Sequence, residues 1–185
     1  MHIPTHILSG WCIGNLVPHF TPRERLFCMI AATAADVDGL GRIVSEELYW
    51  DYHHRLGHNA FFAQLLAAAM AMTSTRGRRG VAFLMYLVLA HVHIILDYFG
   101  SGPGWPLHYL WPASEIGIVN SRAWPFFSWQ NLLAAFALIA WTLVIAWRQG
   151  RTPVEMITPR LDRGFVARLR SLLAGVVGKR AAHRA

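Results

Sequence analysis

Long apolar runs separated by short polar segments dominate the pattern of this chain. The clearest run, Trp129–Trp147, has 19 residues without a charged side chain and ends at Arg148. A second run of equal length, Val81–Phe99, carries three ionisable side chains in its second half. Because a helix of about 20 apolar residues crosses the hydrocarbon core of a bilayer, both runs predict membrane-spanning helices.

Three further apolar runs are shorter, namely Ile7–Val17, Leu26–Ala35 and Ala60–Thr73. Pro18 ends the first of them, and Thr21-Pro22 before the second is typical of a helix cap followed by a first-turn proline. We expect these three segments to form short, tilted or partly re-entrant spans. The pattern therefore predicts an all-α, polytopic membrane bundle of about five helices.

Composition agrees with a membrane protein. Apolar residues make up 55% of the 185 residues and charged residues only 15%, whereas soluble chains average about 45–50% and about 25%. Such a composition excludes intrinsic disorder. The two cysteines, Cys12 and Cys28, lie in apolar surroundings, which excludes a disulfide scaffold.

The net charge of +7 would suggest nucleic-acid binding if it were spread over a folded surface. Residues 149–185 contain eight basic and two acidic side chains, which is +6 of that charge, while residues 1–148 contain nine basic and eight acidic ones. No basic face remains for a nucleic acid. We therefore expect a membrane-embedded domain at 1–148 and a basic tail at 149–185.

The basic residues also predict an orientation. If all five runs cross with the N-terminus outside, the loops 18–25, 74–80 and 148–185 are cytoplasmic and hold 14 of the 17 Lys and Arg residues. Eight of the ten histidines then fall on the outer side. This follows the positive-inside rule and predicts a multi-pass protein of the cell membrane with a cytoplasmic tail.

The tail has the pattern of a basic amphipathic helix, a kind that lies on the anionic inner leaflet and contacts membrane lipids. Its apolar residues recur at helical spacing: Phe165, Val166, Leu169, Leu172, Leu173 and Val176. Basic residues accompany them: Arg163, Arg168, Arg170 and Lys179. The alternative is a soluble tail solvated by its charges.

Two ionisable residues stand out in the second long run. His93 and Asp97 are four residues apart, so they share one face of the helix. An ionisable side chain in a membrane helix costs about 2.5–3.5 kcal/mol on insertion scales, and a metal ion is one partner that offsets this cost. Asp97 is alternatively a group that orients His93, or the pair is a hydrogen bond that only satisfies both side chains.

Two carboxylates, Asp36 and Asp38, end the Leu26–Ala35 run and precede Gly39. Side chains two residues apart diverge on a helix but converge where the helix ends. They are candidate metal ligands, and the alternative is a solvated helix end followed by an Asp-Gly turn.

The densest polar cluster is His53-His54-Arg55-Leu56-Gly57-His58-Asn59. His54 and His58 would chelate one ion in a helix, whereas His53 and His58 suit a turn, which Gly57 permits. Arg55 is a candidate for binding a substrate anion such as phosphate or carboxylate.

Seven candidate ligands thus map to the outer side: His6, Asp36, Asp38, His54, His58, His93 and Asp97, with His53 as a possible addition. Nitrogen and oxygen donors of this kind would hold one or two divalent ions, most simply zinc. Such a centre activates water for hydrolysis. We expect Asp38 to act as the general base. No cysteine belongs to the set, which argues against soft-metal and iron–sulfur sites.

In chain order, these motifs resemble the membrane-bound metal-dependent hydrolases of the LexA-regulated bacterial inner-membrane type. The resemblance covers roughly residues 4–112. It is carried by Thr5-His6-x-x-x-Gly10, Asp36-x-Asp38, His53-His54-Arg55-x-x-His58-Asn59, His93-x-x-x-Asp97 and Pro106-Leu107-x-x-x-Trp111-Pro112. This chain departs from the pattern at Ala35, where a proline is usual, and at residues 57–59, where Thr-His-Ser is commoner.

The resemblance implies a hydrolase of phosphoesters or lipids. The expected function is attack by a metal-activated water on a lipid or other small, membrane-associated ester or phosphoester. Two other classes fit parts of the pattern: an ion or proton transporter with intramembrane His and Asp, and a non-catalytic membrane protein with a structural metal site.

Overall fold

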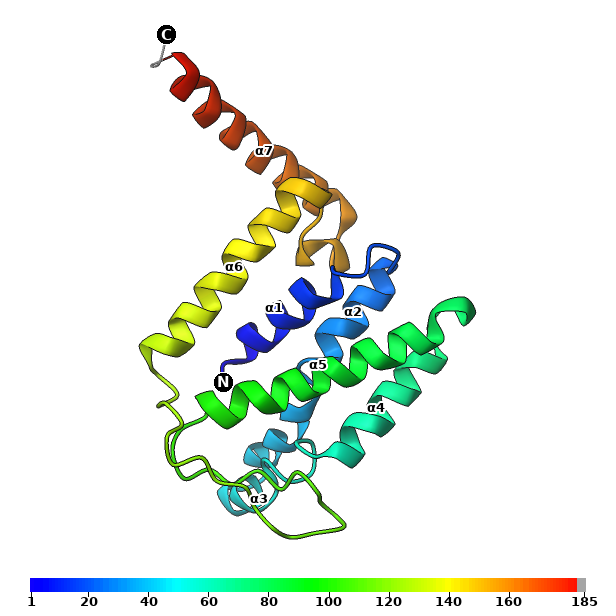
Figure 1. Cartoon of the computed structure of the whole chain (residues 1–185), viewed down its shortest axis with the longest axis vertical. Helices are drawn as coiled ribbons and strands as arrows, with labels where there is room; N and C mark the ends of the chain where they lie inside the picture. The colour runs from blue at the N-terminus through cyan, green and yellow to red at the C-terminus, as the bar shows by residue number, and fades with distance from the viewer. Residues whose placement is uncertain (183–185) are drawn as a thin grey trace. The chain divides into compact units, whose positions relative to one another are not determined.

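A computed structural model describes residues 1–182, apart from the side chains at 173 and 175–182, and its regular structure is helical (Figure 1). A single antiparallel bridge, between Leu107 and Ile118, is the nearest approach to a strand in the described part. The all-α fold class is thus confirmed. The chain divides into two compact units, Met1–Leu138 and Ile139–Ala185.

Seven α-helices and three 3₁₀ helices make up the described chain. The first unit contains α1 (Ile3–Gly14), α2 (Pro22–Ala31), η1 (Ala34–Ile43), α3 (Glu46–Tyr52), α4 (Ala60–Met72), η2 (Arg76–Arg78) and α5 (Arg79–Gly100). Helix α6 (Trp129–Gln149) begins in the first unit and ends in the second, which also contains η3 (Pro153–Met156) and α7 (Pro159–Ala182).

Two of these helices are long and apolar enough to cross a membrane, Arg76–Gly100 (η2 with α5) and Trp129–Gln149 (α6). Helices α1, α2 and α4 have 12, 10 and 13 residues, so none is longer than about 20 Å at 1.5 Å per residue. The hydrocarbon core is about 30 Å thick. Two helices therefore qualify as full spans by length and composition, and a bundle of five spans is not confirmed.

Small residues let the helices of the first unit approach closely. Helix α1 contacts α2, and α5 contacts both α2 and α4, around a core that includes Ala31, Ala67 and Ala82. A Cβ atom on Gly10 of α1 would lie 2.5 Å from the carbonyl oxygen of Cys28 in α2. Any larger residue at this position would force the two helices apart.

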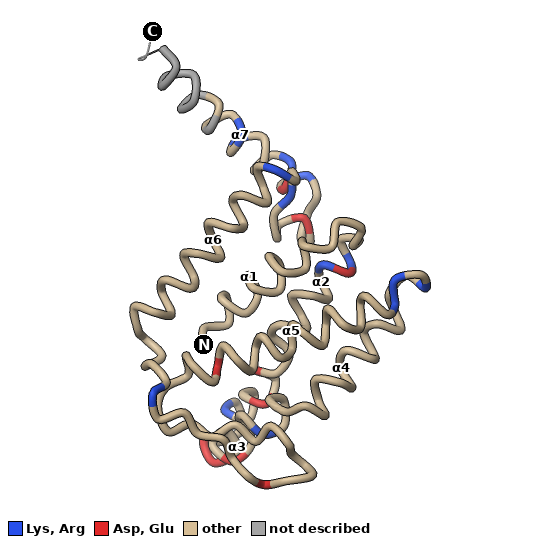
Figure 2. Tube along the Cα trace, viewed as in Figure 1, with Lys and Arg blue, Asp and Glu red and all other residues tan. Residues whose placement is uncertain are grey.

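The chain reverses direction between successive helices, so the start of α1, the end of α2, the start of α4 and the end of α5 meet at one end of the first unit (Figure 1). The opposite end carries the basic residues that begin α2 and that form the turn between α4 and α5 (Figure 2). The histidines and carboxylates singled out in the sequence belong to the first of these ends.

The long connection 101–128 is fastened to both neighbouring helices by Asn131, which is fully buried. Its Nδ2 donates to the carbonyl oxygens of Gly100 (2.9 Å) and Phe126 (2.7 Å). Its Oδ1 accepts from Trp124 Nε1 at 2.6 Å. The connection is therefore held against the end of α5, beside the histidines and carboxylates.

In the second unit, the helix expected for the basic tail is present as α7. Its first turn is fixed by the buried Asp162, which accepts hydrogen bonds from the backbone N–H (2.9 Å) and the hydroxyl (2.6 Å) of Thr152. Phe165 and Leu172 are exposed. The side chains of Leu173, Val176 and Lys179, also part of the expected apolar and basic pattern, lie outside the described residues.

Glu24 fastens the end of the first unit that is remote from the histidines. Its side chain accepts from the backbone N–H of Thr21 (2.8 Å), which completes a capping box on α2. It also accepts from the backbone N–H of Thr75 (3.3 Å) and from two nitrogens of Arg78 (3.3 and 3.2 Å). Burial raises the pKa of Glu24, but these hydrogen bonds outweigh burial and hold it below its ordinary value of 4.5.

Replacing Glu24 should therefore produce a pH-dependent loss of stability. A carboxylate with a lowered pKa stabilises the fold above its ordinary pKa, and this contribution disappears as the pH falls through the folded-state pKa. We expect Glu24→Gln to cost about 1–3 kcal/mol at pH 7 and the difference from wild type to vanish in acid. Thermal unfolding in detergent at several pH values measures it. Glu47→Gln, at an exposed residue of α3, is the control, and a Glu24→Gln deficit that does not change with pH contradicts the prediction.

Candidate metal centre

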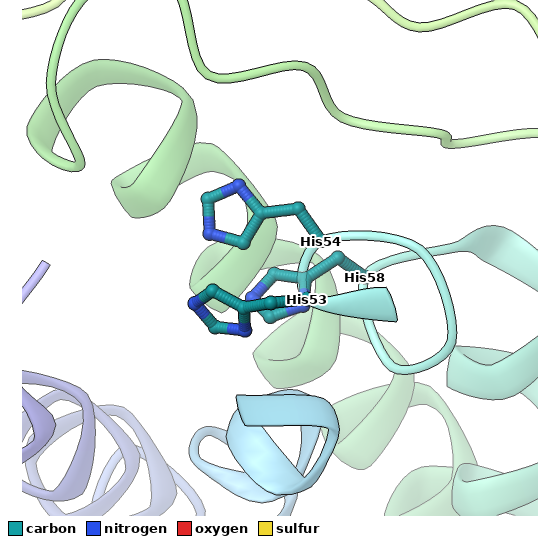
Figure 3. Close-up of side chains that lie close together, drawn as sticks. All are labelled: His53, His54 and His58. Atoms are coloured by element: carbon teal, nitrogen blue, oxygen red, sulfur yellow. The ribbon is translucent and has the colours of Figure 1, made fainter. Parts of the chain in front are cut away.

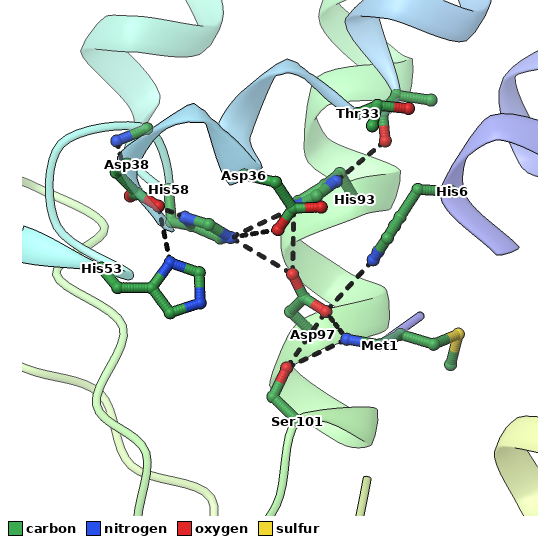
Figure 4. A network of polar contacts seen from close by, with 12 residues as sticks. Met1, His6, Thr33, Asp36, Asp38, His53, His58, His93, Asp97 and Ser101 are labelled. Carbon is green, nitrogen blue, oxygen red and sulfur yellow. Dashed lines mark hydrogen bonds and ion pairs between the residues drawn. The ribbon is translucent and has the colours of Figure 1, made fainter. Parts of the chain in front are cut away.

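Four side chains from three segments converge at the end of α5 (Figure 4). Asp36 comes from η1, His58 from the loop before α4, and His93 and Asp97 from α5. Each offers one ligand atom, and these atoms all lie within 4.8 Å of one another. His58, His93 and Asp97 are buried and Asp36 is half-buried. These groups could hold a metal ion.

The hydrogen bonds around the two imidazoles fix which nitrogen carries a proton. His93 Nδ1 lies 2.8 Å from the carbonyl oxygen of Ala32, and because a carbonyl can only accept, Nδ1 is the protonated nitrogen. His58 Nδ1 lies 2.9 Å from a carboxylate oxygen of Asp38, so it is protonated for the same reason. In the neutral form of each ring, Nε2 has a lone pair that a cation could bind.

These two lone pairs face each other. The Nε2 atoms of His58 and His93 are 3.1 Å apart. Oδ2 of Asp97 lies 2.9 Å from His93 Nε2 and 3.2 Å from His58 Nε2, and Oδ1 of Asp36 lies 3.6 and 3.9 Å from the same atoms. With both rings neutral these four atoms are all acceptors, and a proton or a metal ion between them would relieve their repulsion. The donor set, two imidazoles and two carboxylates, is one that zinc accepts.

The second oxygen of Asp97 faces other partners. Oδ1 contacts the amino group of Met1 and accepts from the Ser101 hydroxyl at 3.0 Å. His6 Nε2 lies 3.3 Å from the same oxygen. The His6 ring is buried and stacks on His93 with centroids 3.9 Å apart, and neither of its nitrogens has a hydrogen-bond partner in the described structure. His6 therefore borders the four-residue group.

Asp38 lies on the other side of the His58 ring, and both of its oxygens are engaged. They accept from His53 Nδ1 (2.7 Å), His58 Nδ1 (2.9 Å) and the backbone N–H of Gly57 (2.9 Å). Burial raises the pKa of the Asp38 carboxyl, but these hydrogen bonds outweigh burial and hold the pKa well below its usual range. Asp38 is thus not among the converging atoms.

Asp36 differs from Asp38 in its surroundings. Its Oδ2 is buried without a hydrogen-bond partner in the described structure. Burial raises the pKa of Asp36 above its ordinary value, and the neighbouring His58 offsets only part of this. The two aspartates that the sequence paired therefore have separate environments, because the 3₁₀ turn of η1 directs them to opposite sides of one imidazole.

His53, His54 and His58 form a second group whose ligand atoms lie within 4.8 Å of one another (Figure 3). His54 has a φ of 66°, in the left-handed region, and its carbonyl oxygen accepts from the His108 N–H at 3.1 Å. Its Nδ1 is buried without a partner in the described structure, and burial, together with His58 and His53, lowers the pKa of His54 well below its usual range. The sequence left open whether His53 or His54 is a ligand together with His58. Both of them lie next to His58.

A cavity of about 350 Å³ opens beside the four-residue group. It is lined by Met1, Asp36, Arg42, Tyr49, Trp50, His53, His54, Asp97, Ser101, Trp105 and Phe126. Arg55, the sequence-based candidate for binding an anion, is not among them. It lines a neighbouring cavity with Asp51 and His108, and its Nη2 lies 3.4 Å from Glu115 Oε2.

Comparison with known proteins places the chain in a family. The family model described as YdjM inner membrane protein matches residues 1–174. The chain belongs to the YdjM inner membrane protein family. No curated protein and no solved structure matches it. Together with the two helices long and apolar enough to span a bilayer, this makes it a membrane protein and confirms the inner-membrane character that the motifs indicated.

Sequence reasoning missed the feature that brings the loop of this family member against η1. A Cβ atom on Gly57 would overlap the carbonyl oxygen of Ala35, so the loop that carries His58 can approach η1 only with glycine there. The adjacent Gly57 N–H reaches Asp38 as a result. The sequence indicated only that Gly57 permits a turn. Its close contact with Ala35 joins two residues far apart in the chain, which no local sequence pattern reveals.

We expect Gly57→Ala to move this loop away from η1. The overlap should lower stability by about 1–3 kcal/mol, measured by thermal unfolding in detergent. Gly80→Ala is the control, because a Cβ at Gly80 meets nothing within 4 Å and alanine favours the helix. Equal unfolding temperatures for wild type and Gly57→Ala would show that the close approach is not required.

Proposed function

We propose that this membrane protein is a metal-dependent hydrolase that cleaves an ester bond in a lipid or another membrane-associated molecule. The observation that carries the proposal is the convergence of four acceptor atoms, from Asp36, His58, His93 and Asp97, beside a cavity of about 350 Å³. A buried cluster of acceptors needs a cation, and an adjacent cavity gives a substrate access to it.

Zinc is the ion we propose, since imidazole and carboxylate donors suit it and no cysteine takes part. His58, His93, Asp36 and Asp97 would hold it, with His6 at the border of the group. When bound, such an ion supplies Lewis acidity and lowers the pKa of water. The hydrogen bonds of Asp38 and of the Ala32 carbonyl would keep both Nε2 lone pairs directed at the ion.

We assign one oxygen of Asp36, Oδ2, as the general base, since Oδ1 is the oxygen that faces His58 and His93 and would hold the ion. Asp36 lines the cavity, and its Oδ2 has no partner in the described structure. In hydrolysis, a bond forms between the water oxygen and the ester carbon or phosphorus, and the bond to the leaving oxygen breaks. Asp36 would take the proton from the water and return it to the leaving alcohol. Asp38, whose oxygens are engaged, would act as a positioning residue for His58.

The orientation we propose follows the charge distribution. The end of the first unit that carries the basic residues of the α2 start and the α4–α5 turn would face the cytoplasm (Figure 2). The metal centre would then lie on the extracytoplasmic side. We further propose that the basic helix α7 rests on the inner leaflet and binds anionic lipids there.

The arrangement of buried ionisable groups favours hydrolysis over ion transport. In the described part of the first unit, the buried Asp, Glu, His, Lys and Arg residues lie at its two ends: Glu24 and Arg25 at one, and the histidines and aspartates of the candidate centre at the other. An ion path would distribute such groups through the bilayer. The cavity beside the cluster likewise favours an open site over a structural metal.

Purified wild-type protein should contain stoichiometric divalent metal, measured by mass spectrometry of the metal content. We expect His58→Ala and His93→Ala each to lose it, since each removes one of the facing nitrogens. His91→Ala is the matched control on the same helix, because His91 hydrogen-bonds Leu87 O and Tyr109 instead. Metal-free wild-type protein with an intact circular-dichroism spectrum contradicts the prediction.

Activity is tested on lipids extracted from native membranes. Wild-type protein should release an alcohol and an acid or phosphate, identified by mass spectrometry, and a chelator should stop the release. We expect Asp36→Asn to lower the rate about 100-fold or more while the protein still unfolds at the wild-type temperature. Absence of any product from loaded wild-type protein would refute hydrolysis of these lipids.

A further inference from the structure

The cavity beside the metal centre is lined by both charged and aromatic side chains. Asp36 and Asp97 supply carboxylates, and Trp50 and Trp105 belong to an aromatic wall. Arg42 is the one Lys or Arg among the described residues that line this cavity. No sequence motif singled out Arg42, which lies in η1 six residues after Asp36.

Arg42 is held by a ring and has no carboxylate partner within residues 1–182. Its guanidinium carbon lies 5.3 Å from the centroid of the Tyr49 ring, a cation–π arrangement. The Tyr49 ring in turn stacks on His53, with centroids 4.7 Å apart, and His53 Nδ1 donates to Asp38. A continuous series of contacts therefore connects Arg42 to the side chains that position the metal ligands. Arg42 also hydrogen-bonds the Tyr49 side chain, which leaves the other donors of its guanidinium to an anion.

Arg55 contrasts with Arg42 in both respects. It faces Glu115 at 3.4 Å, and it lines a different cavity. The Nε of Arg55 is buried without a hydrogen-bond partner in the described structure, but its Nη2 already faces a carboxylate, and an arginine so placed gains less from a second anion.

Arg42 also changes the charge that the cavity presents to a substrate. Asp36, Asp38 and Asp97 supply three carboxylates, which a divalent ion and the Met1 amino group in contact with Asp97 would together offset. Arg42 is then the positive group that would attract an anionic substrate to the cavity.

We propose that Arg42 binds the anionic oxygens of a phosphate ester and that the aromatic wall contacts the organic part of the same molecule. A guanidinium offers paired donors that match phosphate. Phosphate presents oxygens in several directions, so one group can contact Arg42 while facing the metal centre. Trp50 and Trp105, with ring centroids 4.9 Å apart, provide an apolar surface for the ester's organic part. This inference rests on the proposed hydrolase function for the fate of the ester.

Binding is tested by isothermal titration calorimetry of the full-length protein in a neutral maltoside detergent. The probes are dihexanoyl phosphatidic acid, inorganic phosphate and the uncharged dihexanoylglycerol, each with metal-loaded and with chelator-treated protein.

We expect Arg42→Ala to weaken binding of the phosphatidic acid to the loaded protein by about tenfold or more, with Arg42→Lys intermediate. Arg55→Ala is the matched control and should stay within about twofold of wild type. Because Arg42 is exposed, its variants should unfold at the wild-type temperature.

Each outcome bears on the proposal. Loss of phosphatidic acid binding in Arg42→Ala alone supports it, whereas equal losses in Arg42→Ala and Arg55→Ala, or no binding by wild type, overturn it. If the protein binds the phosphatidic acid more tightly than inorganic phosphate, and Trp50→Ala reduces this difference, the result supports a lipid ester. If the two probes bind equally, the proposed role of the aromatic wall is overturned. Arg42-dependent binding without hydrolysis refutes the proposed function only, and hydrolysis of phosphate esters that is unchanged in Arg42→Ala refutes this inference only.

Discussion

Two imidazole rings with their lone pairs facing each other are the constraint on which the rest of the first unit depends. His58 and His93 can hold this position, with Nε2 atoms 3.1 Å apart, only because Asp38 and the Ala32 carbonyl bind the opposite nitrogen of each ring. Those two partners come from η1 and the end of α2. The close approach of η1 to the loop at Gly57 brings one of these partners, Asp38, against His58.

Buried ionisable groups at the two ends of the first unit have opposite surroundings. At one end, Glu24 is surrounded by donors from Thr21, Thr75 and Arg78, so its charge is balanced and it fastens the fold. At the other, two imidazoles and two carboxylates converge on a space that could hold a metal ion. Unbalanced buried polar groups cost free energy, and their concentration in one place is the physical mark of a site.

The sequence predicts much of this, for identifiable reasons. Helices α5 and α6 were expected because long apolar runs have few alternatives. Five site residues were singled out because ionisable groups are conspicuous in apolar surroundings: His6, Asp36, His58, His93 and Asp97. The short α3 was not expected, since Glu46–Tyr52 has no apolar periodicity. The different environments of Asp36 and Asp38 depend on a 3₁₀ turn, and the placement of Arg42 rather than Arg55 in the cavity depends on long-range packing. Neither leaves a local trace.

The depth of Asp97 in the longest apolar helix of the first unit has an energetic consequence. Asp97 lies three residues before Gly100, the last residue of α5, so the converging atoms are about 5 Å from the end of that helix. Moving an acyl chain from the bilayer into water costs about 0.8 kcal/mol for each CH₂ group. A lipid whose head group reached this level would keep its chains among the other lipids. Its reaction would therefore need no extraction step, and the barrier would be independent of chain length.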